Sequence, residues 1–250
     1  DLVGKAGLPI LLLDDAASAE HYPCDLLLNQ NVQASPDKYT GRTGARVLAG
    51  PGYALIRADM RQAVPPRTIP ERPQRILVLV GGADPGGHLE MLAQAAAQAL
   101  LKAGLGDGHV DAVIGPASTW QPPADAGPMI AYHRGVKDMG ALIGKADLAI
   151  SSAGSTVWEL SLQGTPMILG ASVPVEEPVG AGMAARGAAL YLGRFSDCLP
   201  EQLVAEIVRL LQDSAMRRKL SATASALVDG RGAERVIDAM LGIEAGTGIP

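Results

Sequence analysis

The chain has 250 residues, of which 48% are hydrophobic and 19% charged, with a net charge of −5. This composition is that of a globular protein long enough for a large core, and it excludes a disordered chain. The acidic balance and the 3% of aromatic residues argue against nucleic acid as a partner, because such partners need basic patches and stacking platforms. No apolar run reaches the length of a membrane span, so we expect no membrane partner either.

Histidine and cysteine spacing predicts neither a metal site nor a bound cofactor. The four histidines show no ligand spacing of the H-E-x-x-H kind. Cys24 and Cys198 lie far apart and outside any C-x-x-C pattern, which favours free thiols in a reducing compartment. We therefore expect a cytoplasmic protein, and a monomer.

Residues 1–60 are predicted to form strands and turns. Apolar runs at 9–13 and 25–28 end in polar residues, as strands of a covered parallel sheet do, and 16–22 has room for one helical turn. Two further strands are expected at 47–49 and 53–56. Residues 61–74 carry four prolines and almost no apolar side chains, which predicts a linker between two domains.

From residue 75 to the end, strand and helix patterns alternate, which predicts an α/β domain with a doubly wound parallel sheet at 75–250. The expected strands are 75–80, 110–114, 129–132, 148–150, 166–169 and 189–192, and the expected helices are 89–103, 136–145, 156–163 and 179–186. Two or three closing helices are expected within 199–241, followed by a frayed tail at 242–250. In such sheets a ligand lies outside the carboxyl ends of the strands. The loops at that edge are 81–87, 133–135, 151–155 and 170–178.

The segment from Ser151 to Glu159 is the most informative of these loops. A small-residue turn follows an apolar strand and leads into a helix, which suits a phosphate at the turn. Glu159, one helical turn further on, is placed to hold a ribose. An S/T-x-x-E capping box from Thr156 to Glu159 explains the same residues without any ligand. The segment alone leaves the two interpretations evenly balanced.

Three weaker signals accompany it. Gly81-Gly82-Ala83-Asp84 follows a strand, and paired glycines allow a close backbone approach, although a tight turn explains them equally well. Arg57 ends an apolar run and suits a phosphate, with a salt bridge to Asp59 as the alternative. Glu176 and Glu177 suit sugar hydroxyls but would repel a pyrophosphate, and a charged loop is the alternative. Acid–base work by His21, near Asp14, Asp15 and Asp25, is less favoured than a structural role.

Several of these segments together resemble one family. The motifs are residues 14–15 with 21–31, 52–57, 81–84, 151–159 and 186–193, in this order. They resemble the UDP-2,4-diacetamido-2,4,6-trideoxy-β-L-altropyranose hydrolase of pseudaminic acid biosynthesis, a relative of the peptidoglycan UDP-N-acetylglucosamine transferase. The resemblance covers nearly the whole chain. It implies the two-Rossmann-domain glycosyltransferase (GT-B) fold.

The resemblance also implies roles for individual residues. The turn of Ser152, Ala153, Gly154 and Ser155 would hold the diphosphate, and Glu159 the ribose. Val136 would offer its backbone to the uracil. The phosphate contacts would come from Arg57, Gly82, Ala83 and Asp84. Glu176 and Glu177 stand where the family usually has Asn-Gln, which leaves the sugar open.

The family also begins with a strand and a G-x-G-H-x-x-R loop whose histidine is the general base, and this chain has no such motif. We therefore expect the base upstream of Asp1 and residues 1–60 to be a remnant of a truncated N-terminal domain. The implied reaction is metal-free attack of water on the anomeric carbon with release of UDP. The 250 residues are expected to bind UDP but to turn over substrate poorly. A UDP-sugar-dependent glycosyltransferase and a non-catalytic nucleotide-binding module stay open as alternatives.

Overall fold

The computed structural model describes residues 8–61 and 67–243, which fall into two compact units. Residues 8–57 and 228–243 belong to the first unit, and the described residues of 58–227 to the second. The predicted division at 61–74 differs from this one in two respects. The boundary between the units comes a few residues earlier, and the last helix belongs to the same unit as the N-terminal segment instead of to 75–227.

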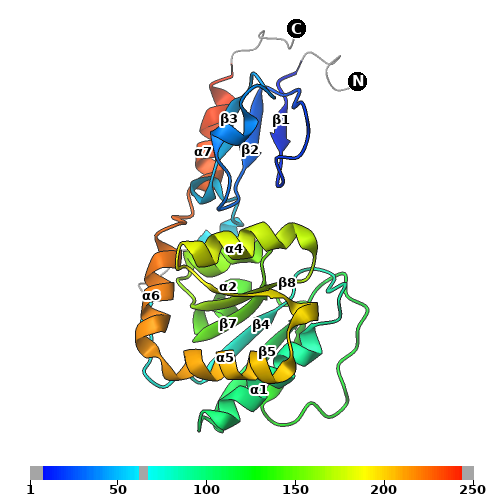
Figure 1. Cartoon of the computed structure of the whole chain (residues 1–250), viewed down its shortest axis with the longest axis vertical. Coiled ribbons are helices and arrows are strands. Elements are labelled where there is room, and N and C mark those ends of the chain that lie inside the picture. Colours follow the sequence, from blue (N-terminus) through cyan, green and yellow to red (C-terminus); the bar gives the residue numbers. More distant parts are fainter. Residues whose placement is uncertain (1–7, 62–66, 244–250) are drawn as a thin grey trace. The chain divides into compact units, whose positions relative to one another are not determined.

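The first unit is a small parallel sheet with one helix. Strands β1 (Leu11–Leu13), β2 (Leu26–Asn29) and β3 (Arg46–Ala49) pair in that order. Helix α7 (Gly232–Leu241) packs Val236 and Ala239 against the leucines of β2 and β3, and Figure 1 shows it running alongside β3. This apolar contact explains why a helix from the end of the chain belongs to the first unit.

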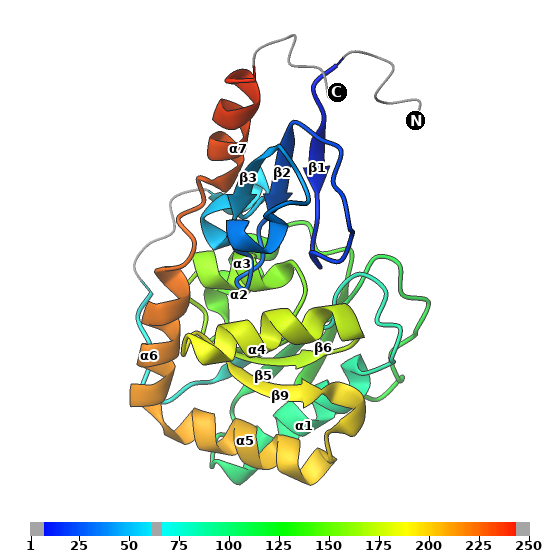
Figure 2. The same ribbon diagram turned by 45° about the horizontal axis from the view of Figure 1, so that its top comes forward.

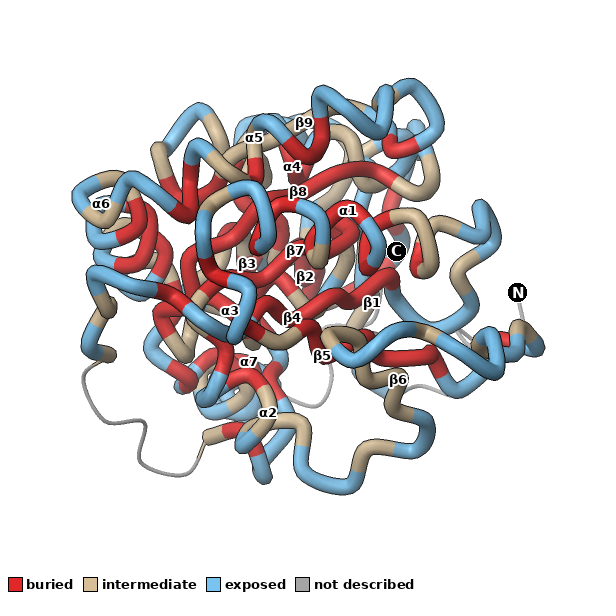
Figure 3. The backbone as a smooth tube through the Cα atoms, turned by 90° about the horizontal axis from the view of Figure 1, so that it is seen from below, coloured by how far each residue is buried: buried red, intermediate tan, exposed pale blue. Residues whose placement is uncertain are grey.

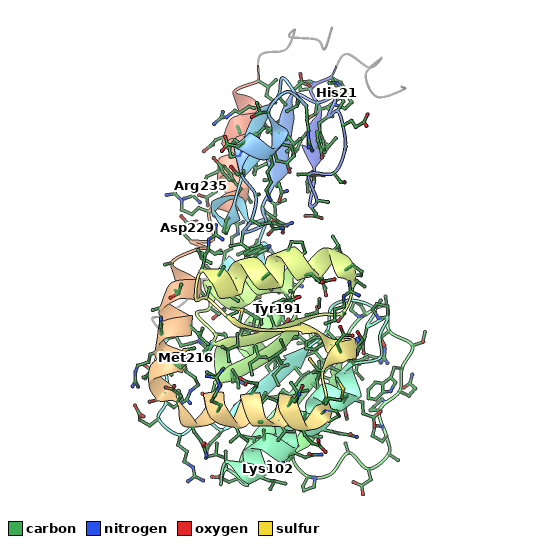
Figure 4. The ribbon with its side chains drawn as sticks, in the orientation of Figure 1. His21, Lys102, Tyr191, Met216, Asp229 and Arg235 are labelled. Atoms are coloured by element: carbon green, nitrogen blue, oxygen red, sulfur yellow. The ribbon has the colours of Figure 1, made fainter. Side chains whose placement is uncertain are left out.

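The start of α7 is fixed to the loop after β3 by two further contacts. Gly232 lies so close to Ala54 that a Cβ at position 232 would overlap with the Ala54 backbone. Arg235 donates from Nη1 to the carbonyl oxygen of Gly52 and to Asp229 Oδ1, both at 2.8 Å. Figure 4 shows Asp229 and Arg235 side by side at this point.

Two local predictions in the first unit are wrong. Residues 53–56 form no strand, because the chain turns at Gly50 (φ 100°) into the 3-10 helix η3 (Pro51–Tyr53). Residues 16–22 contain no helical turn. Their N–H groups are taken by side chains instead: Asp14 accepts from Ala17 at 2.7 Å, and the Tyr22 hydroxyl accepts from Ala19 at 3.0 Å.

The second unit has a six-stranded, wholly parallel sheet. Its strands are β4 (Arg75–Leu79), β5 (His109–Ile114), β6 (Ile130–Arg134), β7 (Leu148–Ser152), β8 (Met167–Ala171) and β9 (Leu190–Arg194), in the order β6-β5-β4-β7-β8-β9. Every predicted strand of this region is present, with ends that shift by one or two residues. Figure 3 shows the inner strands β4, β7 and β8 as buried.

Helices cover both faces of this sheet, which confirms the doubly wound α/β prediction. Helices α1 (Leu89–Lys102) and α5 (Pro200–Gln212) pack together on one face. The other face carries α2 (Met139–Lys145), α3 (Thr156–Leu162) and α4 (Glu177–Ala185), as Figures 1 and 2 show. Helix α6 (Ser214–Ser225) packs against α3. None of the described helices combines the length and the apolar composition that a bilayer crossing demands.

The predicted linker is only partly seen, since 62–66 lie outside the described residues, and the rest of it is not free. Arg217, which is fully buried, donates to the carbonyl oxygens of Pro70 at 2.6 Å and Leu210 at 2.7 Å. Arg67 donates to carbonyl oxygens near the ends of α2 and α3. These hydrogen bonds fix 67–71 to the second unit, because an arginine has five N–H donors to share among backbone acceptors.

Candidate functional site

The strand order of the second unit has one switch point, between β4 and β7. From β4 the chain moves outward to β5 and β6, then returns to the other side of β4 with β7 and continues to β8 and β9. Loops that leave the carboxyl ends of the strands at such a point diverge and form a crevice, where doubly wound proteins bind ligands. The loops at this point are the Gly81 turn and the Ser151–Ser155 turn.

These two turns lie against each other. A Cβ on Gly81 would stand 3.6 Å from the Ser152 hydroxyl oxygen. The Gly81 turn is also held from the β5 side, where the Ala117 N–H donates to the Gly82 carbonyl oxygen at 2.9 Å. Gly115 packs so closely on Gly82 that it has no room for a side chain. The structure therefore brings together two of the predicted site segments.

The side chain of Asp84 is already occupied. Its Oδ1 accepts from the His88 N–H at 2.9 Å and its Oδ2 from the Leu89 N–H at 3.0 Å, so it caps the start of α1. The Asp84 carboxylate is thus used within the protein and would repel a phosphate, so its side chain does not support the predicted contact of Asp84 with the phosphates. Gly82 and Ala83, in contrast, are exposed.

The Ser151–Ser155 turn is only partly exposed. Ser152 and Ala153 are buried, and the Ala153 N–H donates to the Gly170 carbonyl oxygen at 2.9 Å as an extension of the sheet. Ala153 is a predicted part of the diphosphate turn, but its N–H is used within the sheet and is not available to an anion. Gly154 is partly exposed and Ser155 exposed.

Helix α3 does not begin with the Thr156 capping box. Thr156 is the first helical residue and Ser155 is the N-cap, and the Ser155 side chain makes no capping hydrogen bond. Glu159 is half-buried in the first turn. Thr156 is therefore not the N-cap that the predicted capping box requires.

The structure separates Glu176 from Glu177. Glu176 Oε2 accepts from the Ser172 N–H at 2.7 Å, and its Oε1 points at Gly154, where a Cβ would stand only 3.1 Å away. Glu177 begins α4 and forms an ion pair with Arg194 at 2.6 Å. Only Glu176 of the two is brought to the Ser151–Ser155 turn. Ser172, whose backbone N–H orients Glu176, could not be predicted from the sequence, because any residue type except proline supplies a backbone donor.

The structure does not test the predicted roles of two further site residues. Val136 lies in the loop after β6, behind Gly135 (φ 67°), and not in a helix as predicted, since α2 begins only at Met139 with Asp138 as its cap. Arg57 is the last residue of the first unit and is exposed. Both assignments stay predictions.

The first unit has its own polar cluster at the carboxyl ends of β1 and β2. The buried Tyr39 hydroxyl donates to Asp14 Oδ2 and accepts from Asn29 Nδ2, both at 2.7 Å. Burial, followed by the nearby Asp14, raises the pKa of Tyr39 well above its ordinary value. His21 is exposed (Figure 4), and Asp25 accepts from the Ile10 N–H at 2.7 Å. These contacts favour the structural interpretation of this segment.

A second polar cluster lies on the sheet itself. Asp111 Oδ1 is 2.7 Å from His133 Nε2 and 3.3 Å from His109 Nε2, and Arg75 approaches its other oxygen at 3.6 Å. These groups give the buried Asp111 hydrogen-bond and ionic partners. Within 8–61 and 67–243, no three His, Cys, Asp or Glu side chains are grouped as a metal site would require.

Comparisons with known proteins support the architecture. No family model matches the chain. The spore coat polysaccharide biosynthesis protein SpsG of Bacillus subtilis (strain 168) is 28% identical over 195 residues, which are 76% of this chain and 57% of that protein. The chain thus spans little more than half the length of this relative.

Two solved structures share the fold. The crystal structure of Acinetobacter baumannii MurG is 18% identical, with a TM-score of 0.61 over 96% of this chain and 68% of that one. The spinosyn rhamnosyltransferase SpnG, complexed with thymidine diphosphate, is 18% identical with a TM-score of 0.64 over 95% and 69%. The predicted fold class is confirmed: the chain has a GT-B-like α/β fold and is related in sequence to SpsG.

Proposed function

We propose that the second unit binds a UDP-sugar at the switch point and that the whole protein hydrolyses it. The observation that carries this proposal is the meeting of the Gly81 and Ser152 turns between β4 and β7. Paired glycines and small residues there let a diphosphate approach backbone. The relative SpsG is a polysaccharide biosynthesis protein, and SpnG was solved with a nucleoside diphosphate, which supports the same ligand class.

The residue roles that we propose use exposed or partly exposed groups. Gly82, Ala83, Gly154 and Ser155 offer backbone to the diphosphate, and Glu159 accepts hydrogen bonds from the ribose hydroxyls. Val136 offers backbone to the uracil from the loop after β6. Arg57, in the first unit, stays a prediction that rests on its chemistry alone, because a guanidinium binds phosphate oxygens bidentately.

The proposed reaction breaks the bond between the anomeric carbon and the diphosphate. Water attacks the anomeric carbon, the electron pair of the broken C–O bond stays on the phosphate oxygen, and the water proton passes to a general base. The products are UDP and a free diacetamido-trideoxy sugar. Donors aimed at the departing diphosphate stabilise the charge that develops there. We assign the base to none of the 250 residues.

A second candidate is sugar transfer by the same donor pocket, which the fold shared with the rhamnosyltransferase SpnG favours. The residues 14–31, which resemble the hydrolase, favour hydrolysis. Incubation with UDP-N-acetylglucosamine and with diacetamido-sugar nucleotides, followed by NMR of the anomeric proton, separates the two. Free sugar supports hydrolysis, and a glycoside that forms only with an added acceptor supports transfer.

Calorimetric titration of the 250-residue chain tests the pocket itself. We expect UDP to bind more tightly than 2′-deoxy-UDP, since Glu159 reads the ribose hydroxyls. Glu159→Gln should weaken UDP binding by about ten- to a hundredfold, because hydrogen bonds to a charged group are worth roughly 1.5–3 kcal/mol. It should also remove the preference for ribose. Glu201→Gln, an exposed acid at the start of α5, is the matched control. No heat at millimolar UDP would reject the proposal.

A further inference from the structure

Glu176 is anchored on one side and open on the other. Its Oε2 accepts from the Ser172 N–H at 2.7 Å and, more weakly, from the Val173 N–H at 3.4 Å. Its Oε1 accepts no hydrogen bond from any residue in the described part of the chain. Oε1 instead faces Gly154, the partly exposed residue of the Ser151–Ser155 turn.

The anchor keeps the carboxylate where it is. Glu176 ends the 3-10 helix η5 (Pro174–Glu176), whose backbone is restricted by Pro174, and α4 follows directly. Gly154 has just enough room for the carboxylate, since a Cβ there would stand 3.1 Å from Oε1. A ligand at the turn therefore meets a negative charge that moves aside only if the hydrogen bond to Ser172 breaks.

The charge of Glu176 is also uncompensated, in contrast to that of its neighbour. Glu177 is paired with Arg194, whereas no arginine, lysine or histidine of the described residues forms an ion pair with Glu176. Glu176 and Glu177 look equivalent in the sequence, but only the charge of Glu177 is balanced by an ion pair. This difference supplies a matched pair for experiment.

We propose that Glu176 lets the site discriminate against free nucleoside diphosphate in favour of the sugar nucleotide. This inference rests on the proposed function. Cleavage leaves the terminal phosphate with one more negative charge and takes away the sugar, whose hydroxyl and amide N–H groups would donate to Oε1. Glu176 therefore repels the product more than the substrate, and it promotes product release.

Calorimetric titration of Glu176→Gln with UDP tests this role. A glutamine keeps the shape and an oxygen for the Ser172 N–H but removes the charge. Removing one like charge a few ångströms from the diphosphate is expected to tighten UDP binding about tenfold. UDP-N-acetylglucosamine should not bind more tightly to the variant, because the lost repulsion is offset by a weaker hydrogen bond from the sugar.

Glu177→Gln is the comparison variant, and it should change UDP affinity much less than Glu176→Gln does. Glu176→Ala, which removes charge and anchor together, guards against a misfolded glutamine variant, and circular dichroism checks both. UDP binding that is unchanged or weaker in both Glu176 variants would overturn the inference and leave the proposed function standing. Absence of UDP binding in wild type and variants alike would overturn both.

Discussion

The Nε of Arg67 donates a hydrogen bond to the carbonyl oxygen of Gln163, 96 residues further along the chain, at 2.8 Å. Its Nη2 reaches the carbonyl oxygen of Ile143 and the hydroxyl of Thr165, both at 2.9 Å. The last carbonyls of a helix have no partner within it, so this one guanidinium satisfies acceptors at the ends of both α2 and α3. The partial burial of the Arg67 guanidinium lowers its pKa.

Arg67→Met should destabilise the second unit by about 3 kcal/mol, because it leaves several carbonyls without a partner in a dry environment. Urea unfolding followed by the fluorescence of Trp158, buried in α3, measures this. The control is Arg72→Met: Arg72 pairs with Asp107, and the two side chains are 59% and 55% exposed, so the loss should stay below about 1 kcal/mol. Equal losses for the two variants would contradict the role of Arg67.

Gly232→Ala should destabilise the first unit selectively. The added Cβ overlaps with the backbone of Ala54, which cannot rotate away as a side chain does, so we expect a cost of about 1–3 kcal/mol. Hydrogen exchange should quicken for the amides of β2 and stay unchanged for those of β7. Gly44→Ala, in the same unit, places its Cβ in open space and should leave both rates alone. Faster exchange in β7 would show that α7 supports the second unit instead.

The first unit should lose stability in alkali because of Tyr39. Burial, and then the neighbouring Asp14, raise its pKa in the folded state above the ordinary value of about 10. The stability that this shift contributes is complete below about pH 10 and is lost as the pH rises toward the folded-state pKa. Tyr39→Phe should be less stable at pH 8, since it loses two hydrogen bonds, but should depend less on pH between about 9 and 11. Urea unfolding of both proteins across this range is the measurement, and parallel pH profiles would contradict the assignment.

Much of the second unit could be predicted because its signals are local. Ile76 to Val80 and Leu148 to Ile150 are apolar runs of strand length, and each is followed by small turn residues. Such runs predict buried parallel strands whatever lies elsewhere in the chain. Because parallel strands end at the same edge of a sheet, the loops that follow them could be predicted to lie at that edge. The alternation of these strands with helices predicts the α/β fold, which is confirmed.

The first unit was harder to predict because its backbone is fixed by distant groups. Residues 53–56 are apolar enough for a strand, but they lie under α7, which comes from the far end of the chain. Within 16–22, the N–H groups of Ala17 and Ala19 donate to the side chains of Asp14 and Tyr22. Helix propensity takes no account of such contacts. In both places a nonlocal contact or a side-chain acceptor replaces regular structure.

Residue patterns along the chain are enough to predict the strands of the parallel sheet and the turns that meet at its switch point. Which side chains are available at these turns depends on the folded arrangement. In the folded protein Asp84 caps the start of α1 and Glu177 pairs with Arg194, whereas Glu176 faces Gly154. Strand and turn signals depend on neighbours along the chain, whereas the free or occupied state of a carboxylate depends on donors that only folding brings near.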